Sequence, residues 1–109
     1  AQIRRVVLNI LDNSKKYMNK ENGEIEVTLR EKDNNIIVQI KDNGAGVPKN
    51  DLPFIFDKFY RADTARSTKA GSGLGLAITK QIIEGHQGKI WCISKENEGT
   101  SILFSLKKL

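Results

Sequence analysis

The chain has 109 residues, of which 39% are hydrophobic and 28% charged, with one cysteine, one histidine and a formal charge of +5. This length and composition are typical of one globular domain, and they exclude an internal disulfide and a Cys/His zinc cluster. The basic residues are scattered and no aromatic-basic motif accompanies them, so the charge predicts no nucleic-acid binding but leaves a smaller polyphosphate ligand open. The sequence has neither a run of about 18 apolar residues nor a signal-peptide layout, which predicts a cytoplasmic domain without direct membrane contact.

The first part of the chain predicts a helix followed by two strands. Apolar residues at three-and-four spacing indicate an amphipathic helix over residues 2–18. Ile25, Val27 and Leu29 alternate with charged residues, which predicts a half-buried strand. A second strand over residues 36–40 is expected to pair with the first as a hairpin.

The second part of the chain predicts a loop, a helix and another hairpin. Residues 48–61 hold four of the seven aromatic residues. The remaining elements are, in chain order, a mobile loop over residues 62–72, a helix over 73–84 closed by Gly85, and a hairpin with strands over 89–94 and 100–106. This order predicts an α/β two-layer sandwich in which helices cover one face of a sheet.

The stretch KDNGAGVP, residues 41–48, is the first segment with chemical interest. Its glycines, Gly44 and Gly46, permit positive φ and allow a ligand to approach the backbone beside Asp42. Asp-Asn-Gly between apolar strands is also a strong hairpin signal. Taken alone, these residues leave a turn and a binding site as alternatives.

Two further motifs carry polar groups. Asn9, Asn13 and Lys16 are spaced by four and three residues, so they project from one face of the first helix. The segment AGSGLGLAI opens the second helix with alternating glycines and offers unpaired backbone N–H groups to an anion; these are Gly71, Gly73 and Gly75. The segment is neither a Walker loop nor a dinucleotide fingerprint. The three motifs together supply a carboxylate for a base, amides for a metal and a phosphate cradle, which predicts a nucleoside triphosphate site.

These residues resemble the ATP-binding catalytic domain of sensor histidine kinases, in the GHKL superfamily with the Bergerat fold. VVLNILDNSKKY is similar to its asparagine box, KDNGAGVP and GSGLGLAI to its two glycine boxes, PFIFDKFYR to its phenylalanine box, and NEGTSILFSL to its C-terminal hairpin. The resemblance covers essentially all 109 residues. It implies an α/β (α+β) two-layer sandwich with a mixed sheet covered on one face by helices, and a mobile ATP lid.

The resemblance also implies residue roles. Asp42 accepts a hydrogen bond from the adenine amine, Gly46 lets the ring lie against the backbone, and Thr100 completes the adenine end with its hydroxyl or a bridging water. Asn13 ligates Mg²⁺, with Asn9 as a second ligand or beside it. Asn13 and Lys16 are also assigned to catalysis. Arg61 and Arg66 of the lid would reach the γ-phosphate. The other implied nucleotide-binding residues are Lys16, Tyr17, Gly44, Gly71, Gly73, Leu74 and Gly75.

Several of these residues also have plain structural interpretations. Tyr17 is equally consistent with covering the core, and the phenylalanines of residues 54–59 are expected to pack and anchor the lid. His86 is expected to be structural rather than a phosphoacceptor. Ser14, where the family more often has alanine, and the additional Lys15 are departures that remove no implied ligand.

The resemblance implies that the chain binds ATP and Mg²⁺ and donates the γ-phosphoryl group to a histidine on a separate dimerisation domain, with a response regulator as an indirect partner. Superfamily members that hydrolyse ATP place a glutamate where this chain has Asn9, so a superfamily ATPase or serine kinase is a second hypothesis, and a non-catalytic nucleotide sensor a third. Residues 1–109 are then expected to be a catalytic domain truncated at its N-terminal end, from a membrane-anchored kinase. Such a fragment should not phosphorylate itself and should expose an apolar patch or lose stability.

Overall fold

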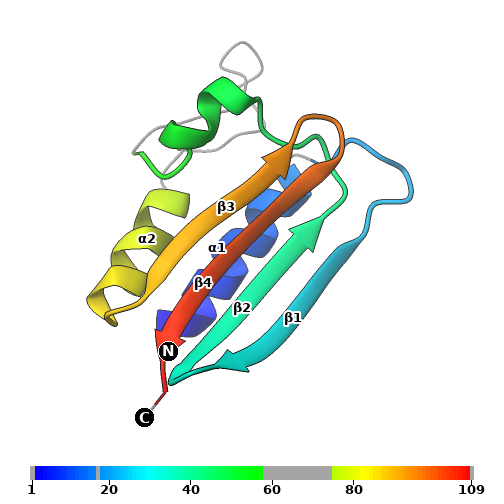
Figure 1. Cartoon of the computed structure of the whole chain (residues 1–109). Coiled ribbons are helices and arrows are strands. Elements are labelled where there is room, and N and C mark those ends of the chain that lie inside the picture. The colour runs from blue at the N-terminus through cyan, green and yellow to red at the C-terminus, as the bar shows by residue number, and fades with distance from the viewer. Residues whose placement is uncertain (1, 17, 58–74, 109) are drawn as a thin grey trace.

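The computed structural model describes residues 2–16, 18–57 and 75–108, and it has two layers, a sheet and the helices on one of its faces (Figure 1). In chain order the elements are α1 (Gln2–Lys16), β1 (Ile25–Lys32), β2 (Asn35–Asp42), the 3-10 helix η1 (Lys49–Phe54), α2 (Gly75–Gly85), β3 (Lys89–Lys95) and β4 (Gly99–Lys107). The two-layer α/β arrangement predicted from the order of elements is confirmed. None of the described helices is long and apolar enough to cross a membrane.

The described strands form one sheet in the order β1-β2-β4-β3. The predicted hairpins β1–β2 and β3–β4 are both present, and β4 pairs with β2 between them. Every one of these pairings is antiparallel, so the mixed sheet that the resemblance implied is not what the described strands form. The reason is that each hairpin reverses the chain, and β4 also runs opposite to β2.

The core lies between the helices and the inner face of the sheet. The helices contribute residues at helical spacing, and the central strands contribute alternate residues, as both periods require. The buried apolar residues of this cluster are Val6 and Ile10 of α1, Val38 and Ile40 of β2, Ile55, Leu76 and Ile83 of α2, and Ile102 and Phe104 of β4. Each such side chain contributes about 1.5–3 kcal/mol when fully buried, so this layer fixes α1 and α2 against β2 and β4.

The strand β1 is not covered in the way its sequence predicts. Its apolar residues Ile25, Val27 and Leu29 pair with Asp42, Ile40 and Val38, so they share the inner face of the sheet. Yet all eight residues of β1 are exposed, and Leu29 is 67% exposed. The prediction of a half-buried strand is therefore wrong, because α1 lies over β2 and no described element lies over β1.

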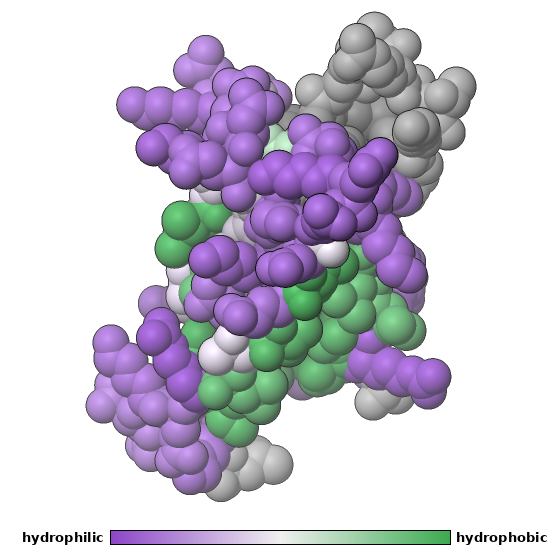
Figure 2. Space-filling view, turned by 90° about the vertical axis from the view of Figure 1, so that its right-hand side faces the viewer, coloured by the Kyte–Doolittle hydropathy of each residue, from purple (hydrophilic) through white to green (hydrophobic). Residues whose placement is uncertain are grey.

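The uncovered part of the sheet forms an apolar patch. Ile25, Val27 and Leu29 lie there, and Leu8 of α1 is a further exposed apolar residue, at 49% exposure. Figure 2, which views the molecule from the side of β1, shows hydrophobic residues gathered between hydrophilic ones. The apolar patch expected from the sequence is thus present.

Two local expectations need correction. Gly85 does not close α2, because it is still helical and the left-handed residue is Gln87, at φ 62°. The N–H of Gly88 then bonds the carbonyl of Ile83 at 2.9 Å, which satisfies one of the last carbonyls. In the aromatic segment Ile55 is buried and Phe56 is half-buried against the core, as expected of a packing residue, whereas Phe54 is 54% exposed.

Candidate functional site

The predicted polar residues that the structure describes come from four elements that meet at one end of the molecule. In Figure 1 the end of β2, the start of β4, the last turns of α1 and the first turn of α2 all lie toward the same end. Asp42 and Thr100 are direct partners across β2 and β4. Asn9 Nδ2 lies 3.5 Å from the carbonyl of Gly75, which joins α1 to the start of α2. The fold therefore brings together residues that are far apart in the sequence.

Asp42 is a buried carboxylate with one oxygen held in place. Its Oδ1 accepts hydrogen bonds from the backbone N–H of Gly44 at 2.9 Å and of Thr100 at 3.3 Å. Within the described part of the chain, no hydrogen bond reaches its Oδ2. An ionised carboxylate only accepts hydrogen bonds, so Oδ2 is an oriented acceptor suited to a ligand N–H group.

The glycine segment after Asp42 is not a hairpin turn. A hairpin would pair β2 with β3, but β4 lies between them. The segment instead packs on the β3–β4 hairpin, where Asn97 N–H donates to the Ala45 carbonyl at 2.6 Å. At Gly46, φ is 73° and a Cβ would lie 2.2 Å from the Lys95 carbonyl, so this contact requires glycine. The implied role of Gly46 beside an adenine ring stays a prediction.

Ser94 of β3 is a polar residue of this site that the sequence reasoning missed. Its Oγ accepts from Val47 N–H at 2.8 Å, donates to the Gly99 carbonyl at 2.8 Å and lies 3.0 Å from Thr100 Oγ1. Ser94 and Thr100 are paired across β3 and β4. No local motif marks Ser94, and its place becomes apparent only from the register of three strands.

The three predicted side chains of α1, at spacings of four and three, lie on one face of the helix. Asn9 and Asn13 are half-buried and Lys16 is exposed. Asn9 Nδ2 is 3.5 Å from both the Gly75 carbonyl and Thr79 Oγ1, so its donor end faces α2 and its oxygen remains for another partner. Amide oxygens are hard ligands of the type that Mg²⁺ takes together with water and phosphate oxygens. Among the described residues no group of three His, Cys, Asp or Glu side chains lies close enough to hold a metal ion.

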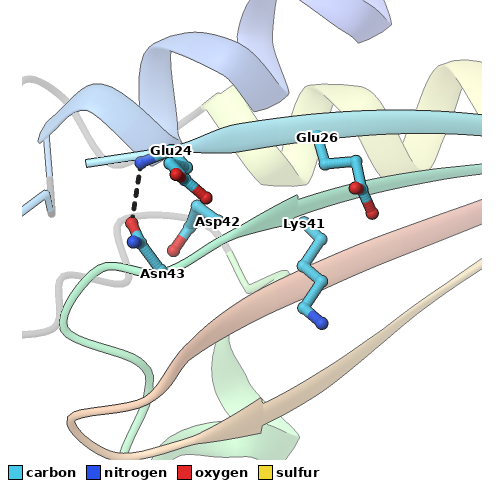
Figure 3. Close-up of a pocket in the computed structure, with 5 residues that line it drawn as sticks. All are labelled: Glu24, Glu26, Lys41, Asp42 and Asn43. Carbon is cyan, nitrogen blue, oxygen red and sulfur yellow. Dashed lines mark hydrogen bonds between the residues drawn. The ribbon is translucent and has the colours of Figure 1, made fainter. Parts of the chain in front are cut away.

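A small hollow lies beside Asp42 at the open end of the β1–β2 hairpin, where β1 begins and β2 ends (Figure 3). It has a volume of about 130 Å³ and is lined by Glu24, Glu26, Lys41, Asp42 and Asn43. Ligand pockets commonly measure about 300–1,000 Å³, and only Asp42 belongs to the predicted site, so this hollow alone does not hold a nucleotide. The bond from Glu24 N–H to Asn43 Oδ1, 2.8 Å long, ties the glycine segment to the chain before β1.

Similarity to known proteins places this chain in a family. The family model described as "Histidine kinase-, DNA gyrase B-, and HSP90-like ATPase" matches residues 1–109. The chain belongs to this family. It is 47% identical to the sensor protein kinase WalK of Staphylococcus haemolyticus over 100 aligned residues, and the alignment covers 90% of this chain. The chain spans only 16% of the length of that relative.

Solved structures narrow the place of the chain within the ATPase family. The fold is similar to that of a mycobacterial sensor histidine kinase, MprB, with a TM-score of 0.83 and 36% identity, over 94% of this chain and 70% of that one. Full-length ShkA in complex with AMPPNP matches with a TM-score of 0.80 and 26% identity, over 95% of this chain and 21% of that one. The chain is thus a member of the ATP-binding domains of sensor histidine kinases, as its motifs implied.

Some residues that the kinase resemblance singles out lie outside the described part of the chain. They are Tyr17, Arg61, Arg66, Gly71, Gly73 and Leu74. Their roles stay predictions. Gly75 is described and is exposed in the first turn of α2, consistent with a place near the implied phosphate cradle. His86 bonds the Ile82 carbonyl through Nδ1 at 2.8 Å, a contact at the helix end that agrees with a structural role.

The single cysteine of this kinase domain is expected to be unreactive in the folded state. Burial first, and the negative charge of Asp42 second, raise the pKa of the Cys92 thiol from 9.0 to about 12. Near pH 8 the folded chain should therefore react with iodoacetamide at least about 100-fold more slowly than the chain unfolded in guanidinium chloride. Equal rates in the two states, measured against a Cys92→Ser blank, would contradict this.

The same shift has a consequence for stability. The unfolded thiol loses its proton near pH 9, whereas the folded thiol keeps it until about pH 12. The stabilisation is therefore complete below pH 9 and is lost as the pH rises toward 12. Urea titrations measure the free energy of unfolding of the chain and of Cys92→Ser across this pH range. The wild-type value should fall relative to that of Cys92→Ser as the pH rises.

Proposed function

We propose that this chain binds Mg·ATP at the end of the sheet that carries Asp42 and Thr100, and presents the γ-phosphoryl group to a histidine on a separate dimerisation domain. The observation that carries the proposal is the buried Asp42, whose Oδ1 is held by Gly44 and Thr100 while Oδ2 has no partner within the described residues. AMPPNP, an analogue of adenosine triphosphate, is bound in the similar kinase ShkA, which supports the same ligand class here.

The base end of the proposed site recognises the edge of adenine. The exocyclic amine of adenine donates hydrogen bonds, and Asp42 Oδ2 accepts one. Guanine has a carbonyl at the same place, which would meet the carboxylate with two acceptors opposed. The carboxylate therefore orients the base and selects it, because its other oxygen is fixed by two backbone N–H groups.

The phosphate end of the proposed site uses α1 and the start of α2. The oxygen of Asn13, with that of Asn9, would hold Mg²⁺, and these amides fit a hard ion that keeps water and phosphate ligands. When bound, the ion neutralises charge on the phosphates during transfer. The cationic Lys16 would add positive charge, and backbone N–H groups at the start of α2 would bond phosphate oxygens.

Transfer to a histidine fits this site better than hydrolysis. Activation of water needs a general base, and the amide of Asn9 takes no proton at neutral pH. In the structure the Asn9 amide faces Gly75 and Thr79 and ties α1 to α2. Phosphoryl transfer rests mainly on positioning and charge neutralisation, so a nucleophile supplied by another domain is sufficient.

The wider assignment follows from the relatives. The chain would act as one module of a longer two-component kinase that is anchored in a membrane, with this domain in the cytoplasm. A histidine-bearing dimerisation domain would be its direct partner, and a response regulator would receive the phosphoryl group afterwards.

Calorimetric titration of ATP with and without Mg²⁺ tests the metal assignment. We expect Mg²⁺ to tighten ATP binding, and Asn13→Ala to remove about tenfold or more of that gain while leaving magnesium-free binding within about twofold. The matched control is Asn35→Ala, because Asn35 is an exposed amide at the opposite end of β2. Full retention of the magnesium effect in Asn13→Ala would exclude Asn13 as a ligand, and steady release of phosphate by the chain alone would favour an ATPase.

A further inference from the structure

Ser94 forms the end of a polar row that crosses three strands. Asp42 of β2, Thr100 of β4 and Ser94 of β3 are successive cross-strand partners. All three are buried or half-buried, and Thr100 is only 9% exposed. Cross-strand partners direct their side chains to the same face, so Thr100 lies between the carboxylate and the Ser94 hydroxyl.

The hydrogen atoms of this row can be assigned from its fixed partners. A serine hydroxyl has one hydrogen to donate. The Gly99 carbonyl can only accept and the Val47 N–H can only donate, so the hydrogen of Ser94 goes to Gly99 and Ser94 accepts from Val47. In the remaining contact, 3.0 Å long, the Thr100 hydroxyl must therefore be the donor to Ser94. Thr100 then has only lone pairs for any other partner.

We propose that Ser94 is a positioning residue for base selection: by taking the Thr100 hydrogen, it makes Thr100 an acceptor beside Asp42. The inference rests on the proposed function, namely ATP binding at this site. Two adjacent acceptors suit the two N–H groups of a 6-amino purine and disfavour the carbonyl of a 6-oxo purine. Without Ser94 the Thr100 hydroxyl is free to turn and donate to that carbonyl.

Ser94 also has a plain structural contact, which the test must separate from this role. Its bond to Val47 N–H ties the glycine segment to β3, and its loss would weaken binding of every nucleotide at the site. Selection between bases is a ratio of two affinities, and a general displacement of the segment reduces both. The ratio of ATP to inosine triphosphate affinity therefore reports the effect on Thr100.

The experiment is calorimetric titration of the chain with ATP and with inosine triphosphate. We expect wild type to prefer ATP, and Ser94→Ala to lower the affinity ratio about five- to tenfold. In a Thr100→Val background, Ser94→Ala should leave the affinity ratio within about twofold of that of Thr100→Val alone, because the Thr100 hydroxyl is already absent. Ser94→Thr, which keeps the hydroxyl, should retain the wild-type ratio of ATP to inosine triphosphate affinity.

Ser105→Ala is the matched control. It removes a comparable serine–backbone bond, from Lys89 N–H at 3.3 Å, at the far end of the same strand pair. We expect it to leave the ratio unchanged. If Ser94→Ala does not fold by circular dichroism, Ser94→Cys preserves the shape with a much weaker hydrogen-bonding group and should lower the ratio in its place.

Three outcomes would overturn the inference. An unchanged ratio in Ser94→Ala, with both affinities reduced, would leave Ser94 a structural tie only. An equal fall of the ratio in the Thr100→Val background would show that Ser94 does not act through Thr100. Folded wild type that binds neither nucleotide would remove the proposed function itself, and the inference with it.

Discussion

Asp42→Asn is expected to weaken ATP binding about 100-fold, which corresponds to the roughly 2–3 kcal/mol of a hydrogen bond to a charged group. The backbone N–H groups of Gly44 and Thr100 both donate to Asp42 Oδ1, so the single oxygen of an asparagine must take that place. Its NH₂ group then lies where Oδ2 was. A donor would face the donor of an adenine amine, and the charge would be lost as well.

The same substitution should change the preferred base. The amide NH₂ can donate to the carbonyl of hypoxanthine, so Asp42→Asn is expected to bind inosine triphosphate as tightly as ATP or more tightly. Calorimetry with both nucleotides checks this. The matched control is Asp33→Asn, because Asp33 is an exposed aspartate in the β1–β2 turn, and its positive φ of 54° suits asparagine. If Asp42→Asn keeps the wild-type ATP affinity, Asp42 is not the residue that reads the base.

The periodic parts of the sequence predicted the helices and strands well. The apolar spacing of α1 and the strands expected over residues 36–40 and 100–106 include residues that are in fact buried, such as Ile10, Ile40 and Phe104. The strand β1 shows the limit of such patterns. Alternation predicts which face Val27 and Leu29 occupy, and that prediction was correct, but burial depends on which element lies over the strand.

Some residues of the candidate site could be predicted from the sequence, and others could not. The composition of KDNGAGVP marked Asp42 and its glycines, and the register of β2 and β4 then placed Thr100 beside Asp42. Which oxygen of Asp42 is held, and by which N–H groups, depends on the local turn and is not encoded in any spacing. Ser94 was not singled out from the sequence, because no local motif marks it and its place beside the site depends on β4 lying between β3 and β2.

Gly99→Ala is expected to be the most damaging single substitution for the fold and the site together. Gly99 has φ of 125°, a conformation that an alanine rarely adopts, and a Cβ there would lie 2.1 Å from the Asp42 carbonyl and 2.9 Å from Asn43 Cα. Both atoms belong to the backbone and cannot move aside cheaply. We expect a loss of about 3 kcal/mol or more in the free energy of unfolding, from strain and displaced strands together.

Urea denaturation of Gly99→Ala and of Gly85→Ala measures this effect against a matched control. Gly85 is helical, and a Cβ there would meet nothing within 4 Å beyond its own helix backbone and chain neighbours. Alanine at this position should therefore be neutral or stabilise the fold by about 0.5–1 kcal/mol. Wild-type stability in Gly99→Ala would show that the β3–β4 turn can shift without cost.

The effect of Gly99→Ala should extend from stability to binding. The atom that the new methyl group strikes is the carbonyl of Asp42, and the Gly99 carbonyl also holds the hydrogen of Ser94. Even where enough folded protein remains, as at low temperature, ATP affinity should fall because Asp42 and Thr100 no longer share one register. Titration of that folded fraction with ATP measures this loss. Unchanged affinity in the destabilised variant would mean that the base is held by contacts other than this strand pair.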